Sequence, residues 1–102
     1  MDKIAALSEI LTADPTNAFA RYGLAMEHNT QGNSDLALNE FATLIRHNPD
    51  YVPGYQMSAQ TLAKLGRTEE AVARLREGLA AAKRTNNSHA TSEMQTLLDD
   101  LS

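Results

Sequence analysis

Apolar residues recur along this chain with the period of an α-helix. Between residues 34 and 47 they stand at the spacing i, i+1, i+4, i+7 and i+8, which forms one stripe on a helix with 3.6 residues per turn. The stripe consists of Ala37, Leu38, Phe41, Leu44 and Ile45. Residues 68–84 repeat it with Ala71, Val72, Leu75, Gly78, Leu79 and Ala82. No stretch alternates as a β-strand does, so the pattern predicts an all-α protein of five or six antiparallel helices.

Glycine and proline mark where these helices begin and end. Gly32 and Gly66 suit the left-handed backbone that follows many helix C-termini, and Pro53 suits a first helical turn. We therefore expect helices over about 18–31 and 34–47, a third helix that has Pro53 in its first turn and ends at Gly66, and a fourth that Thr68 precedes and that has Lys83 and Arg84 in its last turn. An oxygen of Asn33 or Ser34 is expected to cap the second of these helices, and Thr68 to cap the fourth.

The chain also repeats itself at a fixed interval. The same separation along the chain, about 34 residues, relates Ala25 to Ala59, Gly32 to Gly66, Ala37 to Ala71, Phe41 to Leu75 and Asp14-Pro15 to Asn48-Pro49. A fixed period of about 34 residues is the mark of stacked helical hairpins, each of which buries its apolar face against its neighbours.

These residues resemble the tetratricopeptide repeat family. The family pattern has a small residue at its eighth position, glycine near the fifteenth and alanine at the twentieth, which Ala25, Gly32 and Ala37 match in the first copy. Arg21 departs from the aromatic fourth position, which Tyr55 fills in the second copy. The resemblance implies an antiparallel helix-hairpin solenoid, with an N-terminal half-repeat helix over 1–16, repeats over 17–50 and 51–85, and a C-terminal capping helix over 86–102.

The predicted C-terminal helix departs from the repeat register. Glu93 stands where the repeat interval calls for a small residue, although Ala90, Met94, Leu97, Leu98 and Leu101 form an amphipathic stripe. We expect this helix to cover the apolar stripe of the helix before it, as the ends of solenoids require. The polar segment Thr85-Asn86-Asn87 leaves a second possibility open, in which the helix swings free and is itself a binding element.

Composition adds few constraints. The 102 residues carry a net charge of −4 and include no cysteine, which excludes disulfides and argues against phosphate-backbone binding. The three histidines show no metal-binding spacing, and His28 is expected to be half-buried and hydrogen-bonded. No hydrophobic run spans a membrane and no export signal is visible, so we expect a cytoplasmic protein without catalytic residues, cofactor or metal.

The resemblance places a partner-binding groove on the first helix of each repeat. The candidate groove residues are Phe19, Tyr22, Met26, Asn29, Gln56, Gln60, Ala63 and Lys64. Tyr22 and Met26 replace the lysine and asparagine with which some family members clamp a peptide carboxylate, so that activity is not expected. Binding of a protein or peptide, but not of nucleic acid or membrane, is the favoured hypothesis. Self-assembly into a homo-oligomer through exposed ends is the alternative.

Overall fold

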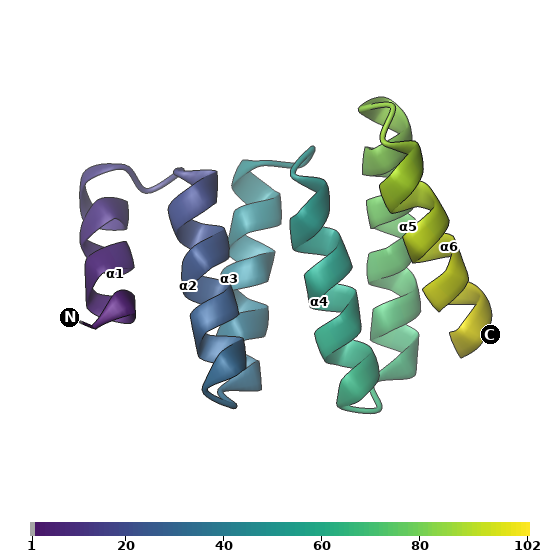
Figure 1. Ribbon diagram of the computed structural model, residues 1–102, viewed down its shortest axis with the longest axis horizontal. Coiled ribbons are helices and arrows are strands. Elements are labelled where there is room, and N and C mark those ends of the chain that lie inside the picture. The colour runs from purple at the N-terminus through teal and green to yellow at the C-terminus, as the bar shows by residue number, and fades with distance from the viewer. Residues whose placement is uncertain (1) are drawn as a thin grey trace. The chain divides into compact units, whose positions relative to one another are not determined.

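The computed structural model describes residues 2–102, and these contain six α-helices and no strand. The helices are α1 (Lys3–Ala13), α2 (Ala18–Thr30), α3 (Ser34–His47), α4 (Val52–Lys64), α5 (Thr68–Arg84) and α6 (Ser88–Leu101). Figure 1 shows that successive helices run in opposite directions within α1–α3 and within α4–α6. The predicted all-α helical-hairpin fold is therefore confirmed.

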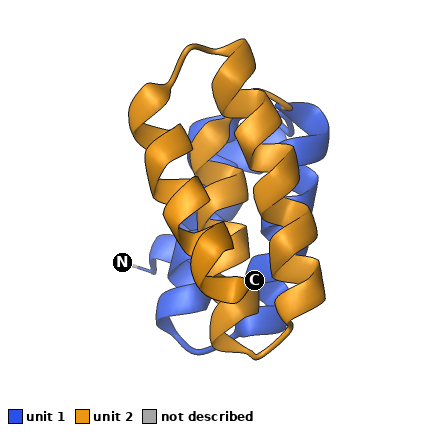
Figure 2. Ribbon diagram, turned by 90° about the vertical axis from the view of Figure 1, so that its right-hand side faces the viewer, with its two compact units in different colours: residues 1–48 blue, residues 49–102 orange. Residues whose placement is uncertain are grey.

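The helices form two compact units, which divide between Asn48 and Pro49 (Figure 2). In unit 1, α2 packs against both α1 and α3. In unit 2, α5 packs against both α4 and α6, and α6 also touches α4. Each unit is thus a three-helix assembly whose central helix contacts both of its neighbours.

The core of unit 1 lies on both sides of α2. Leu11, Ala20 and Leu24 form a buried cluster against which Ile4 and Leu7 of α1 pack. Toward α3, the side chains of Ala25, Ala37 and Phe41 are completely buried. Gly23 has a tight neighbour, because a Cβ there would lie 3.3 Å from both Cδ atoms of Leu7. This contact leaves little room for a side chain at this mid-helix position.

The core of unit 2 requires a glycine at its closest helix contact. A Cβ on Gly78 would lie 2.7 Å from the Sδ of Met94 and 2.7 Å from the Cβ of Tyr55. Since Tyr55 is on α4 and Met94 on α6, Gly78 of α5 lets both helices approach. Met94 is completely buried and Leu98 nearly so, which shows that α6 docks on its own unit as the cap hypothesis requires.

Three helices end with the same left-handed turn. Gly32 and Gly66 have φ of +82° and +76°, and Asn86 takes the same role with φ of 55°. In each turn the following N–H donates back to the helix: Asn33 to His28, Arg67 to Leu62 and Asn87 to Ala82. These are the hydrogen bonds of the Schellman motif.

The capping predictions were wrong in detail. Asn33 occupies the N-cap of α3 but its side chain makes no capping hydrogen bond. Ser34 and Thr68 are the first residues inside their helices, and Arg67 is the N-cap of α5. A hydroxyl at the first helical position is past the place from which it reaches the next free N–H groups. Side-chain caps are made instead by Asp2, Asn17 and Asn87.

Glu93 departs from the repeat register because α5 is longer than α3. The repeat interval separates the starts of α2 and α4, and also those of α3 and α5. The same interval counted from Val52 would start α6 at Asn86, whereas α6 starts at Ser88. The shift arises because α5 has 17 residues and α3 has 14, while the turn after α5 is one residue shorter. Helix α6 therefore begins two residues later than the repeat predicts.

Candidate functional site

Unit 1 presents its predicted groove residues along α2. Phe19 is 78% exposed, an unusual position for a phenylalanine. Tyr22, Met26 and Asn29 are half-buried. The ring of Tyr22 packs against the buried ring of Phe41, with their centres 6.3 Å apart. Phe19 is consequently available to a partner, whereas Tyr22 also supports the core.

Unit 2 presents its predicted groove residues along α4. Gln60 and Lys64 are exposed, and Gln56 and Ala63 are half-buried. The Nε2 of Gln56 donates a hydrogen bond of 3.0 Å to Oε1 of Glu93 on α6. The structure brings Gln56 and Gln60 into one site with α6, and Ala63 and Lys64 lie outside that site.

A pocket of about 300 Å³ lies between α4 and α6. Its lining consists of Gln56, Gln60, Glu93, Met94, Thr96 and Leu97. None of the four α6 residues was among the predicted groove residues, because the C-terminal helix was expected to be either a cap or a free binding element. Glu93 was noticed only as a break in the repeat. That departure was the available signal, because a charged residue at an expected core position indicates a shifted face.

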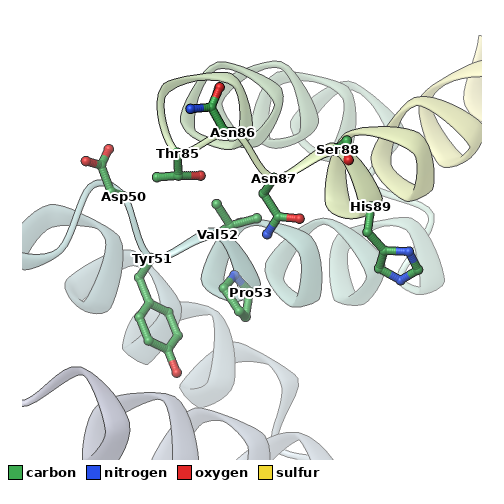
Figure 3. Close-up of a pocket in the computed structure, with 9 residues that line it drawn as sticks. All are labelled: Asp50, Tyr51, Val52, Pro53, Thr85, Asn86, Asn87, Ser88 and His89. Atoms are coloured by element: carbon green, nitrogen blue, oxygen red, sulfur yellow. The ribbon is translucent and has the colours of Figure 1, made fainter.

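A second pocket, of about 470 Å³, lies where the turn before α4 faces the turn before α6. Figure 3 shows Asp50 to Pro53 on one side and Thr85 to His89 on the other, with the Tyr51 ring pointing away from the Thr85-Asn86 turn. Polar groups of its lining are used within the fold. Asp50 pairs at 2.8 Å with Arg84 at the end of α5, and Asn87 Oδ1 caps α6 by accepting from the N–H of Ala90. We therefore regard this hollow as a consequence of the two turns.

Tyr55 is a buried titratable residue of unit 2. The Tyr55 hydroxyl donates a 2.7 Å hydrogen bond to the carbonyl of Pro49, and only 4% of the residue is exposed. Burial raises the pKa of Tyr55 above its usual value of 10.0, and Glu77 adds to the increase, while Arg84 opposes it. This tyrosine ties the start of α4 to the turn before it.

The histidine prediction was half right. His28 is half-buried, as expected. Its Nδ1, however, is buried and has no hydrogen-bond partner among the described residues, so the expected hydrogen bond is not made by that atom. Within residues 2–102, no three His, Asp or Glu side chains gather as they would around a metal ion.

The comparisons with known proteins identify the family. The solution structure of a tetratricopeptide repeat domain protein from Salinibacter ruber is 32% identical to this chain, covers 86% of it and 89% of its own length, and superposes with a TM-score of 0.80. The chain therefore belongs to the tetratricopeptide repeat family. No family model matches the sequence, and no curated protein matches it either.

Two further structures share the fold at low identity. The TPR2B domain of yeast Sti1, in complex with pHsp70, is 17% identical, with 96% of this chain and 78% of that one covered and a TM-score of 0.88. PcrH, in complex with the chaperone binding region of PopD, is 14% identical, with 96% and 74% covered and a TM-score of 0.88. Across residues 2–102, none of the helices has the length and apolar character needed to cross a membrane. The cytoplasmic location stays a prediction.

Proposed function

We propose that this protein is a non-catalytic interaction module that binds an extended protein or peptide segment through the first helices of its repeats. The observation that carries the proposal is that α2 exposes an aromatic ring and that two amide side chains of α4 line a pocket. Phe19 is 78% exposed, and Gln56 and Gln60 line a pocket. Aromatic side chains supply much of the binding energy at protein interfaces, and amides match the donors and acceptors of a peptide backbone.

The structural neighbours support this role by analogy. The Sti1 domain was solved with pHsp70 and PcrH with a region of PopD, so this fold holds segments of other proteins in both cases. Those proteins are only 17% and 14% identical to this chain, and a shared fold does not carry over their particular partners. What carries over to the proposal is the use of the fold as a platform for a polypeptide.

The test compares a surface variant with a matched control. Phe19→Ala combined with Gln60→Ala removes one exposed side chain from each of α2 and α4, and neither residue is buried. Leu36→Ala is the control, because Leu36 is 50% exposed but lies on the second helix of its repeat. Pull-down from the native host with mass spectrometry should lose partners with the double variant and retain them with the control. Equal capture by all three proteins contradicts the proposal.

Self-assembly is the alternative, and one observation favours it. Ile10 on α1 is 43% exposed although the helix buries Leu11 beside it, so α1 has an apolar residue directed away from its core. Light scattering coupled to size-exclusion chromatography separates the two functions. A dimer that Ile10→Gln converts to a monomer favours the alternative, and a monomer at all concentrations favours the interaction module.

A further inference from the structure

The pocket between α4 and α6 has an apolar back and a polar rim. Met94 is completely buried behind it and Leu97 is half-buried in its wall. Methionine adapts its shape to different contacts. At about 300 Å³ the pocket is at the lower end of the range for ligand sites. This size suits one inserted side chain rather than a cofactor, and the apolar wall selects an aliphatic one.

The rim carries a fixed negative charge. Oε1 of Glu93 accepts from Gln56 at 3.0 Å and lies 3.3 Å from Nε2 of His89. Both contacts use the same oxygen, so Oε2 has no hydrogen bond among the described residues. The Glu93 side chain is 50% exposed. A carboxylate accepts several hydrogen bonds, and a lysine or arginine is its strongest partner.

The charge extends along the pocket face of α6. Glu93, Leu97 and Asp100 follow at i, i+4 and i+7, which places them on one face of the helix. Asp100 is exposed. The face therefore presents a carboxylate on each side of an aliphatic residue. Glu93 is the one charged side chain in the pocket lining, and Lys64, a cation at the end of α4, is outside that lining.

The opposite wall offers an amide to a peptide backbone. Gln60 follows Gln56 by one turn of α4, is exposed, and lines the same pocket. Its amide makes no hydrogen bond within residues 2–102, and it has both donor and acceptor atoms. A segment that passes between α4 and α6 can satisfy this amide with a peptide group while a side chain enters the pocket.

We propose that the α4–α6 pocket binds a cationic segment that inserts an aliphatic side chain against Leu97 and pairs lysine or arginine residues with Glu93 and Asp100. This inference rests on the proposed function and specifies the partner's chemistry. The carboxylates of α6 repel an acidic segment and attract a basic one, so charge complementarity selects the partner. The expected ligand is thus positively charged, unlike the peptides that some family members clamp by their carboxylates.

The probe is a displayed library of random peptides, each about a dozen residues long, selected on the intact protein. We expect the enriched peptides to carry net positive charge around a leucine, isoleucine or methionine. Binding of a synthetic enriched peptide should weaken about tenfold when Glu93→Lys or Asp100→Lys reverses one charge, since attraction is replaced by repulsion. A peptide whose positive residues are replaced by glutamate should bind the Glu93→Lys protein again. Changing its aliphatic residue to asparagine should cost about tenfold or more.

The control is Glu9→Lys, which makes the same charge change on an exposed site of α1. This variant should bind like the wild type. Two charge variants are used because Glu93 also contacts Gln56, whereas Asp100 makes no such bond within residues 2–102; circular dichroism verifies that each is folded. An enriched pool that is acidic or has no charge preference overturns this inference and leaves the proposed function intact. Cationic peptides that bind Glu93→Lys and Asp100→Lys at wild-type strength also overturn it. A library from which nothing is enriched contradicts the proposed function itself.

Discussion

Positions 21 and 55 hold the same place in the two units, yet one is arginine and the other tyrosine. Arg21 donates through Nη2 to the carbonyl of Pro15, and Tyr55 donates through its hydroxyl to the carbonyl of Pro49. Both acceptors lie six residues before the donor, and the two prolines are themselves separated by the repeat interval. In both units, therefore, a long side chain with a donor at its tip makes a hydrogen bond to the equivalent turn carbonyl.

The two residues differ in what else they bind. Arg21 also forms a 2.9 Å ion pair with Glu40 of α3, and both side chains are mostly buried. In unit 2, the same proline carbonyl accepts a second hydrogen bond from Arg84, which pairs with Asp50. Unit 1 thus secures its turn through an ionic link between its helices, and unit 2 through a buried phenol assisted by a surface arginine.

Removing α6 should have the largest effect. A chain that ends at Arg84 loses the burial of Met94 and Leu98, at about 1.5–3 kcal/mol for each side chain. Domains of this size have about 5–15 kcal/mol of net stability. We expect a large fall in melting temperature and new oligomers, detected by calorimetry and light scattering. A melting temperature equal to that of the whole chain would show that α6 contributes nothing to unit 2.

Amide hydrogen exchange tests the same helix without truncation. Because Met94 is buried against α5, amides from Met94 to Leu101 should be protected about as well as those of the α5 core. Rapid exchange of this segment in the isolated protein contradicts the docked cap and favours a free binding helix.

The mid-helix glycines of the two units should respond differently to alanine. Gly78→Ala places a Cβ 2.7 Å from Tyr55 Cβ and should destabilise by about 1–3 kcal/mol, as overpacking does. Gly23→Ala meets only the flexible end of Leu7 at 3.3 Å, and alanine gains about 1 kcal/mol of helix propensity. We expect that variant to be close to neutral. Urea unfolding measures both, and equal losses would contradict the contrast.

Removal of the hydrogen-bond donors Arg21 and Tyr55 should lower the free energy of unfolding by different amounts. Tyr55→Phe deletes one hydrogen bond and should lose about 1 kcal/mol. Arg21→Met also leaves Glu40 without its cation in a partly buried site, so its loss should be greater, about 1.5–3 kcal/mol. Arg21→Tyr should recover the part of this stability that comes from the hydrogen bond to the Pro15 carbonyl. The comparison fails if Tyr55→Phe costs as much as Arg21→Met in chemical denaturation.

Alkaline pH should produce the smallest effect, and we expect Tyr55 of unit 2 to contribute to it. Burial raises the pKa of Tyr55 above 10.0, so the folded state holds the phenol proton more tightly than the unfolded state. The resulting stability is complete below about pH 10 and is lost as the pH rises through the folded-state pKa. The stability difference between wild type and Tyr55→Phe should therefore shrink above about pH 10. A constant difference from about pH 8 to 11 contradicts this assignment.

Much of the fold was predictable because its causes are local. The helical period of apolar residues, the turn glycines and the repeat interval predicted four helices, and the observed ends lie within about two residues of the predicted ones. These features act within one helix turn or one left-handed turn, where side-chain spacing and backbone φ decide the conformation. The capping errors at Ser34 and Thr68 concern a single residue at an element's edge.

The candidate site was predictable only on α4, where the repeat interval is kept. Gln56 and Gln60 were located by their position on α4, whereas Glu93 and Leu97 were not, because α6 starts two residues late. The sequence by itself determined the helices, their ends and the family they belong to. Only the tertiary structure decided which face of α6 meets α5 and which face lines a pocket with α4, since the face a helix buries depends on the contacts it finds. Glu93, which stands where the repeat interval calls for a small residue, accordingly lies in the charged rim of that pocket.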